Sequence, residues 1–431
     1  MNIYNWDELD SNEQANALRR PAQDSSDKVY KICYDIIENI KKNGDSALFE
    51  YSRNLDKFDS NKLELSLDEI NKAVDSIDPT LKEAIDTAYS NIKKFHEAQE
   101  GQHVCLETFK GITCKTCTHP IESVGLYVPG GSAPLVSTAL MLSIPAVIAG
   151  CKEIILCSPP PISSAIIYAA YKSGVKRIFN LGGAQAIAAM AYGTKSVPKV
   201  LKIFGPGNQF VTMAKRLVSD DANGAAIDMP AGPSEVLVIA DNNADASLVA
   251  ADLLSQAEHG PDSQVIFLTN SKDTLDKVIK ETNEQVLSLP RKDIALQALS
   301  KSSAILCKSI DEAILISNQY APEHLILQTD NAHDIADKVL NAGSVFVGAF
   351  TPESLGDYAS GTNHTLPTYG YAKTASALGT DDYRRRYTIS YATKEGILGI
   401  AKTVERLACE EGLKAHERAM TLRFKKASEN I

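Results

Sequence analysis

The chain has 431 residues, of which 44% are hydrophobic and 23% are charged, an ordinary composition for a protein of two or three globular domains. Its net charge of -10, without a Lys/Arg-rich block, argues against a nucleic-acid or anionic-membrane partner. Residues 1–8 lack the basic and apolar segments of an export signal, and the apolar stretch 135–150 is too short and too interrupted to span a membrane. We therefore expect a cytoplasmic protein.

The eight cysteines are scattered along the chain, which predicts reduced thiols rather than a disulfide framework. Cys114, Cys117 and His119 resemble the first half of a zinc knuckle, but no second Cys/His pair follows at finger spacing. We interpret this group as a coincidence on a strand.

The N-terminal quarter of the chain predicts helices. Residues 1–20 are polar and predict an arm, whereas 27–54 and 66–101 repeat apolar residues at helical spacing. Ser66 and Glu69 have the spacing of a capping box. Strands are expected within 104–117.

From Val124 onward, strands alternate with helices, and the strands run into glycine-containing turns. These turns are Pro129-Gly130-Gly131, Gly182-Gly183 and Gly205-Pro206-Gly207-Asn208. The repetition predicts a parallel sheet with helices on both faces, in which ligands bind beyond the carboxyl ends of the strands. No turn spells G-x-G-x-x-G, so the glycines alone do not indicate a nucleotide.

A second α/β series opens at 236–240, and its first helix is expected to begin after Asn243 as N-cap and to end at His259. Gln256 and His259 then project from one flank of this helix, a turn apart. Both side chains are acceptable zinc donors. On spacing alone, a solvated last turn is the commoner arrangement.

Three later segments carry chemically useful side chains. Glu323-His324 precedes the strand 325–328 and fits an acid-base pair or a solvent-exposed loop end equally well. The loop 355–367 holds Asp357 and His364 among glycines, which is unusual for a plain connector. A basic strand and two helices follow from 381 as an appendage for association, and Glu411 and His416 there have the pattern of surface charge.

Taken together, these segments resemble the histidinol dehydrogenase family over nearly the whole chain. The resemblance rests on motifs in family order: Val128-Pro129-Gly130-Gly131, Gly182-Gly183-Ala184-Gln185, Phe204-Gly205-Pro206-Gly207-Asn208, Pro230-Ala231-Gly232-Pro233-Ser234-Glu235, Gln256-Ala257-Glu258-His259-Gly260-Pro261, Pro322-Glu323-His324, Gly356-Asp357-Tyr358-Ala359-Ser360-Gly361-Thr362-Asn363-His364 and Gly412-Leu413-Lys414-Ala415-His416.

The resemblance implies an NAD-dependent enzyme with one zinc ion per subunit, which oxidises L-histidinol to L-histidine through L-histidinal. It implies catalytic roles for Glu323 and His324 and places the site residues as follows. The zinc ligands would be Gln256, His259, Asp357 and, from the partner subunit, His416. The substrate would contact these four residues and also Ser234, His324, His364 and Glu411. NAD would contact Tyr127, Gln185 and Asn208.

The resemblance also implies an α/β fold of two Rossmann-like, aldehyde-dehydrogenase-like parallel-sheet domains, and a homodimer with intertwined arms and shared active sites. The expected division is an arm over 1–20, a first domain from 21–124 and 235–380, a second, NAD-side domain over 125–234, and a dimerisation arm over 381–431.

His324 is the expected base for both hydride transfers, and Glu323 would activate water between them. No cysteine lies at a matching position, which argues against a thiohemiacetal route.

Other functions remain open at this stage. A sulfopropanediol dehydrogenase would share the zinc set, although Glu411 and His364 favour an amino-imidazole substrate. A zinc hydrolase could use Gln256, His259 and Asp357, but it would not need the glycine turns. A non-catalytic nucleotide-binding module would have no use for Glu323-His324.

Overall fold

The computed structural model describes residues 1–21, 27–60, 62–99, 101, 103–130, 134–229 and 232–429. The motif positions Gly131, Pro230 and Ala231 lie outside the described residues. The chain divides into two compact units, the first formed by 1–98 with 121–383 and the second by 99–120 with 384–431.

The first unit contains a six-stranded parallel sheet with the order β1-β11-β10-β9-β12-β13. Its strands are β1 (Asn2–Asn5), β9 (Glu235–Ala240), β10 (Gln264–Thr269), β11 (Ser303–Leu306), β12 (His324–Gln328) and β13 (Ser344–Val347). In β9, Val236 and Val238 face one hydrophobic core while Leu237 and Ile239 face another, so both sides of the sheet are covered.

Helices pack on each face of this sheet. One face carries α10 (Ala246–Ala257), α11 (Lys272–Gln285) and α12 (Lys292–Ser300), and the other carries α1 (Ser11–Ala17), α13 (Ile310–Tyr320) and α14 (Ala332–Ala336). The short helix α15 (Glu353–Tyr358) follows β13. Helix α10 begins after Asp245, not Asn243, because the carboxylate of Asp245 caps the backbone N–H of Ser247, and it ends two residues before His259.

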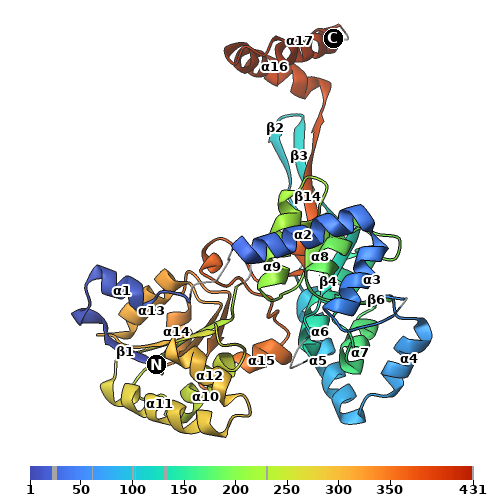
Figure 1. Ribbon diagram of the computed structural model, residues 1–431. Coiled ribbons are helices and arrows are strands. Elements are labelled where there is room, and N and C mark those ends of the chain that lie inside the picture. The colour runs from blue at the N-terminus through green and yellow to red at the C-terminus, as the bar shows by residue number, and fades with distance from the viewer. Residues whose placement is uncertain are drawn as a thin grey trace. The chain divides into compact units, whose positions relative to one another are not determined.

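The first unit also contains a five-stranded parallel sheet with the order β6-β5-β4-β7-β8. Its strands are β4 (Ser123–Tyr127), β5 (Glu153–Ser158), β6 (Arg177–Asn180), β7 (Lys202–Phe204) and β8 (Ala226–Ile227). One face packs against α4 (Leu67–Asp75), α5 (Pro79–Glu97), α6 (Val136–Ala149) and α7 (Ser164–Lys172). The other packs against α2 (Asp27–Asn43), α3 (Asp45–Asn54), α8 (Gly183–Tyr192) and α9 (Gln209–Asp220), with α2 lying against α8 and α9 (Figure 1).

The two sheets share one strand order, since β9 to β13 repeat the arrangement of β4 to β8. In both, the order reverses beside the first strand, between β4 and β7 and between β9 and β12. The predicted Rossmann-like α/β architecture is thereby confirmed.

The packing differs from the expected domain division in two places. Residues 1–20 do not form an arm, because β1 pairs with β11 and Trp6, Ala17 and Leu18 are buried in a core of the six-stranded sheet. The helices of 27–97 lie on the five-stranded sheet, not with 235–380, because Ile36 and Ile92 enter its two hydrophobic cores. Helical periodicity shows that a helix has an apolar face, but not which sheet that face covers.

The second unit is small. It contains an antiparallel sheet of order β14-β3-β2, built from β2 (Cys105–Phe109), β3 (Ile112–Pro120) and β14 (Arg384–Ala392), and the helices α16 (Lys394–Glu410) and α17 (Lys414–Ser428), which pack together (Figure 1). This matches the strands and helices expected here. Among the described residues, no helix combines the length and apolarity that crossing a membrane requires.

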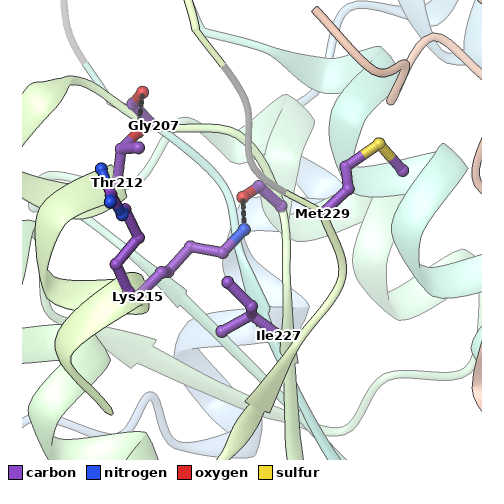
Figure 2. Close-up of a pocket in the computed structure, with 7 residues that line it drawn as sticks. Gly207, Thr212, Lys215, Ile227 and Met229 are labelled. Atoms are coloured by element: carbon purple, nitrogen blue, oxygen red, sulfur yellow. Dashed lines mark hydrogen bonds between the residues drawn. The ribbon is translucent and has the colours of Figure 1, made fainter. Parts of the chain in front are cut away.

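A buried ion pair ties α9 to the end of β8, and both of its partners bond to the turn that follows β7. Figure 2 shows Lys215 extending from α9 beside Ile227, and its ammonium group donates to Gly205 O at 2.8 Å and to the carboxylate of Asp228. Asp228 also accepts from Gly205 N at 2.8 Å, so the carboxylate has partners on both sides. The side chains of Lys215 and Asp228 are only 6% and 2% exposed.

Replacing Asp228 by Asn removes the negative charge of this pair and leaves the buried ammonium group of Lys215 without a charged partner. We expect Asp228→Asn to lower the free energy of unfolding by about 3–5 kcal/mol, measured by urea denaturation. Asp276→Asn breaks the exposed pair with Lys272 on α11 and should cost no more than about 0.5 kcal/mol. Equal effects of the two changes would contradict the structural role given to Lys215 and Asp228.

Candidate active site

The backbone of Glu235, at the start of β9, organises a buried group of ionisable side chains. Its N–H donates to the carboxylate of Glu323 at 2.8 Å, and its carbonyl lies 3.0 Å from Nδ1 of His324. Because a carbonyl oxygen only accepts, Nδ1 must carry the proton of this hydrogen bond, and Nε2 is the ring nitrogen at which a second proton is gained or lost. Nε2 is buried and makes no hydrogen bond among the described residues.

The side chain of Glu235 is itself anchored. Arg20 holds its carboxylate through two bonds of 2.5 and 2.9 Å, and Tyr369 N donates to it at 3.0 Å. The guanidinium of Arg20 also lies 3.8 Å above the ring of Tyr320. A bidentate arginine fixes the carboxylate in direction as well as in position, so β9 enters the site with a defined backbone orientation.

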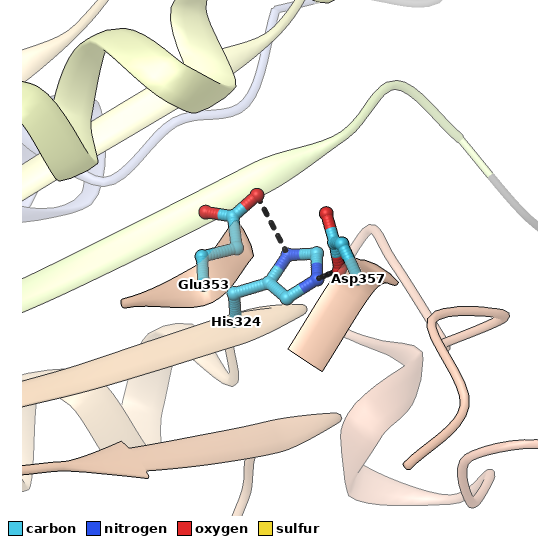
Figure 3. A group of neighbouring side chains, drawn as sticks. All are labelled: His324, Glu353 and Asp357. Atoms are coloured by element: carbon cyan, nitrogen blue, oxygen red, sulfur yellow. Dashed lines mark ion pairs between the residues drawn. The ribbon is translucent and has the colours of Figure 1, made fainter. Parts of the chain in front are cut away.

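Figure 3 shows the acidic side of the site, where His324 lies between Glu353 and Asp357. These two acids are one turn apart on α15, and a ligand atom from each of the three residues lies within 4.8 Å of the others. Nε2 of His324 is 3.4 Å from Asp357, and Nδ1 is 3.7 and 3.9 Å from Glu323 and Glu353. Three buried or largely buried carboxyl groups thus surround one imidazole.

Burial shapes the proton affinities of this group. Burial raises the pKa of Glu323 to about 8, with smaller contributions from the negative charges of Glu235 and Asp357, against the opposing effect of His324. Burial alone would lower the pKa of His324, but Glu353, Glu323 and Asp357 raise it well above its usual value. The pKa of Asp357 is lowered because its contact with His324 outweighs burial.

Gln256 and His259 meet this group from the end of α10. In the amide orientation that satisfies both of its neighbours, Gln256 donates to Glu353 and accepts from Glu235 N at 2.8 Å. His259 keeps exposed surface, yet protein around the ring lowers its pKa, with His324 adding to the shift and Asp357 opposing it. Because α10 runs antiparallel to β9, its last turn returns to the amino end of the strand, and both residues arrive there.

Ser234 and His364 border the same region. Ser234 immediately precedes β9. His364 places Nε2 3.2 Å from Thr138 Oγ1 on α6, and the neighbouring Asn363 donates to Met141 O at 2.7 Å. The loop after α15 therefore bridges the six-stranded sheet to a helix of the five-stranded sheet.

The residues fit a divalent cation. A buried imidazole nitrogen and Glu353 Oε2 both lack hydrogen-bond partners among the described residues. The nitrogen and oxygen donors present here are those that zinc accepts. A cation would also balance the excess of buried carboxylates, which is costly to leave uncompensated.

The residues expected to face NAD lie at the carboxyl edge of the five-stranded sheet. Tyr127 ends β4, and its hydroxyl accepts from Gly183 N at 3.0 Å. Gln185 donates to Asp56 at 3.1 Å beside the same turn. Asn208 is engaged as the N-cap of α9, accepting from Phe210 N and Val211 N.

The glycines of these turns are required by close packing within the chain. A Cβ on Gly205 would lie 2.1 Å from Tyr127 O, and Gly183 has a φ of +61°. Only glycine allows the backbone to pass so close. These turns flank the point where the strand order reverses, which is where open α/β sheets bind dinucleotides, so the residues fit NAD.

Glu411 and His416 belong to the second unit. Both side chains are exposed, Glu411 at the C-cap of α16 and His416 in the first turn of α17. Cys114 and Cys117 lie on β3, and within the described parts of the chain they join no group of metal-binding side chains.

Comparison with known proteins identifies the family. The family model described as histidinol dehydrogenase matches residues 18–424. The chain belongs to the histidinol dehydrogenase family. It is 54% identical to the histidinol dehydrogenases of Escherichia coli and Salmonella typhimurium over 421 residues, which cover 98% of this chain and 97% of each relative. The crystal structure of histidinol dehydrogenase from Elizabethkingia anophelis matches with a TM-score of 0.96, 48% identity and 99% coverage of both chains.

Membership of the histidinol dehydrogenase family makes the chain an oxidoreductase of histidine biosynthesis. It also favours a dehydrogenase over the zinc hydrolase and the non-catalytic module. The motifs include Glu235 but predict no role for it, and they do not include Glu353 or Asp56. A helical spacing of four between Glu353 and Asp357 was the one local signal for Glu353.

The raised pKa of Glu323 gives a test that needs no substrate. Because burial raises this pKa from about 4.5 to about 8, the folded state holds an extra proton between these values, and stability should fall as pH rises across the window. In metal-free protein, the melting temperature of Glu323→Gln minus that of wild type should increase from pH 5 to 8. Above pH 8 this difference should stay constant.

Glu284→Gln, an exposed change on α11, is the control and should follow wild type at every pH. A melting difference between Glu323→Gln and wild type that does not vary with pH would contradict the raised pKa.

Proposed function

We propose that this protein oxidises L-histidinol to L-histidine through L-histidinal, in two NAD-dependent hydride transfers that complete histidine biosynthesis. The observation that carries the proposal is the hydrogen bond between Nδ1 of His324 and Glu235 O, which leaves Nε2, 3.4 Å from Asp357, as the nitrogen that exchanges a proton with the substrate. Family membership supports the choice of histidinol as substrate.

Gln256, His259 and Asp357 would hold zinc with His416 from a partner subunit in a homodimer with intertwined arms. When bound, zinc would supply Lewis acidity and affinity for the amino and imidazole nitrogens of the substrate. The exposure of His416 and Glu411 in the second unit agrees with a role toward another subunit. The eight free cysteines support a reducing, cytoplasmic setting.

The substrate would be oriented by Ser234, His364 and, from the partner subunit, Glu411. NAD, when bound near Tyr127, Gln185 and Asn208, accepts the hydride in each oxidation. Orientation of this kind matters because it converts an encounter between two molecules into a reaction within one complex.

His324 would take the alcohol proton at Nε2 as the hydride leaves the substrate carbon. Its Nδ1 proton stays with Glu235 O, so the ring keeps its tautomer while Nε2 gains and loses a proton. In the second oxidation the same nitrogen would take the proton of the hydrated aldehyde.

Glu323 would take a proton from the water that adds to the aldehyde between the two oxidations, and Nε2 of His324 would return the proton taken from the alcohol to the aldehyde oxygen, so the hydrate forms and His324 can act as a base again. A carboxylate with a pKa of about 8 is a much stronger base than an ordinary glutamate, and a base works best when its pKa is near the operating pH. Because the hydration step belongs only to the aldehyde half of the reaction, the two halves should respond differently to changes at Glu323.

Glu323→Gln should slow the oxidation of L-histidinal by about 10²–10⁴-fold, the usual contribution of a general base, and slow the oxidation of L-histidinol to L-histidinal less. The two rates are measured separately by NADH absorbance, so each substrate is the control for the other. Equal losses would count against the role of Glu323 in activating water.

The function itself is tested by NADH formation with L-histidinol before and after removal of metal. Chelation should abolish activity and zinc should restore it. His259→Asn should lose zinc and activity together, whereas His333→Asn, an exposed histidine on α14, should lose neither. Turnover of a sulfonated diol in place of L-histidinol would reject the substrate, and full activity without zinc would reject the metal.

A further inference from the structure

Glu353 is a fully buried acid that the proposed chemistry leaves without a role. The residue is 1% exposed, and its carboxylate lies between the amide of Gln256 and the ring of His324. One carboxylate oxygen accepts a hydrogen bond from the NH₂ group of Gln256, and Nδ1 of His324 lies 3.9 Å from the same oxygen. The side chain is therefore in direct contact with one proposed metal ligand.

The amide of Gln256 has only one orientation that satisfies its neighbours. Glu235 N–H lies 2.8 Å from the other end of the amide and can only donate. The carbonyl oxygen must face Glu235, and the NH₂ group must face Glu353, which supplies the acceptor. Reversal would set the NH₂ group against Glu235 N–H in a site where unpaired polar groups are costly.

This orientation decides which atom of Gln256 can bind a cation. An amide oxygen has two lone pairs, so a hydrogen bond from Glu235 N leaves one available, whereas an amide NH₂ group only donates. The residue that holds the NH₂ group thereby keeps the oxygen as the ligand atom.

We propose that Glu353 is a positioning residue, which fixes the amide of Gln256 so that its oxygen is presented to the metal. This rests on the proposed function, in which Gln256 is a zinc ligand. Partners that orient metal ligands in this way typically contribute 10–100-fold to metal affinity. The acceptor atom of Glu353 carries the effect, and its negative charge does not.

Two substitutions separate the acceptor from the charge. Glu353→Gln keeps an oxygen that can accept from Gln256 but removes the charge. Glu353→Asp keeps the charge but is one methylene shorter, so its carboxylate no longer reaches the amide. Asp252→Asn is the matched control, because it removes another buried carboxylate on α10, bonded to Gln328 and close enough to affect Glu353 electrostatically.

The zinc dissociation constant of the full-length protein is measured by competition with a chelator, without substrate. Melting of the metal-free variants checks that each is folded. We expect Glu353→Asp to weaken zinc binding about 10–100-fold. The zinc dissociation constant of Glu353→Gln should stay within about threefold of that of Asp252→Asn. Both variants lose a charge, and both keep an acceptor for the NH₂ group of Gln256. If Glu353→Asp does not fold, Glu353→Met, which has no acceptor oxygen, takes its place with the same expected loss.

Wild-type zinc affinity in Glu353→Asp would overturn the positioning role. So would a loss in Glu353→Gln as large as that in Glu353→Asp, because that result would make the charge, or direct coordination by the carboxylate, the cause. A wild-type protein that binds no zinc would instead reject the metal in the proposed function, so the two failures are distinguishable.

Discussion

The peptide groups on either side of Glu235 are the fixed point on which the site depends. One N–H serves Glu323 and Gln256, and one carbonyl sets the tautomer of His324. The side chain is held by Arg20 and Tyr369 N, so these peptide groups cannot turn without breaking a buried ion pair. A proposed catalytic base and a proposed metal ligand are thereby oriented by the same short stretch of β9.

The two parallel sheets of the first unit place their candidate functional residues at opposite ends of their strands. In the five-stranded sheet, the glycine turns follow the carboxyl ends of β4, β6 and β7, as ligand sites in such sheets usually do. In the six-stranded sheet, the ionisable group gathers at the amino ends of β9 and β12, where α10 returns. The loop of Asn363 and His364 spans the two sheets through α6. Repetition of one strand order therefore does not imply repetition of one site.

The sequence was informative where the signal is local. Strand and helix periodicity predicted both series of α/β units. The spacing of Gln256 and His259 predicted that both lie near the end of one helix, although α10 ends at Ala257 and His259 follows it. Periodicity could not assign the helices of 27–97 to a sheet, nor show that residues 1–20 add an edge strand. Glu353 was missed because its contact with Gln256 joins residues almost a hundred positions apart, and no spacing along the chain encodes such a meeting.

The use of backbone groups at Glu235 has a consequence for how this site tolerates change over evolutionary time. Every amino acid carries the same carbonyl, and every one except proline carries the same N–H. Changes of side chain along β9, other than at the anchored Glu235, therefore leave the backbone groups that face His324 and Glu323 intact as long as the strand keeps its course. This part of the site is preserved as long as the backbone path is preserved. Substitutions elsewhere that bend this path are therefore the ones that selection must remove.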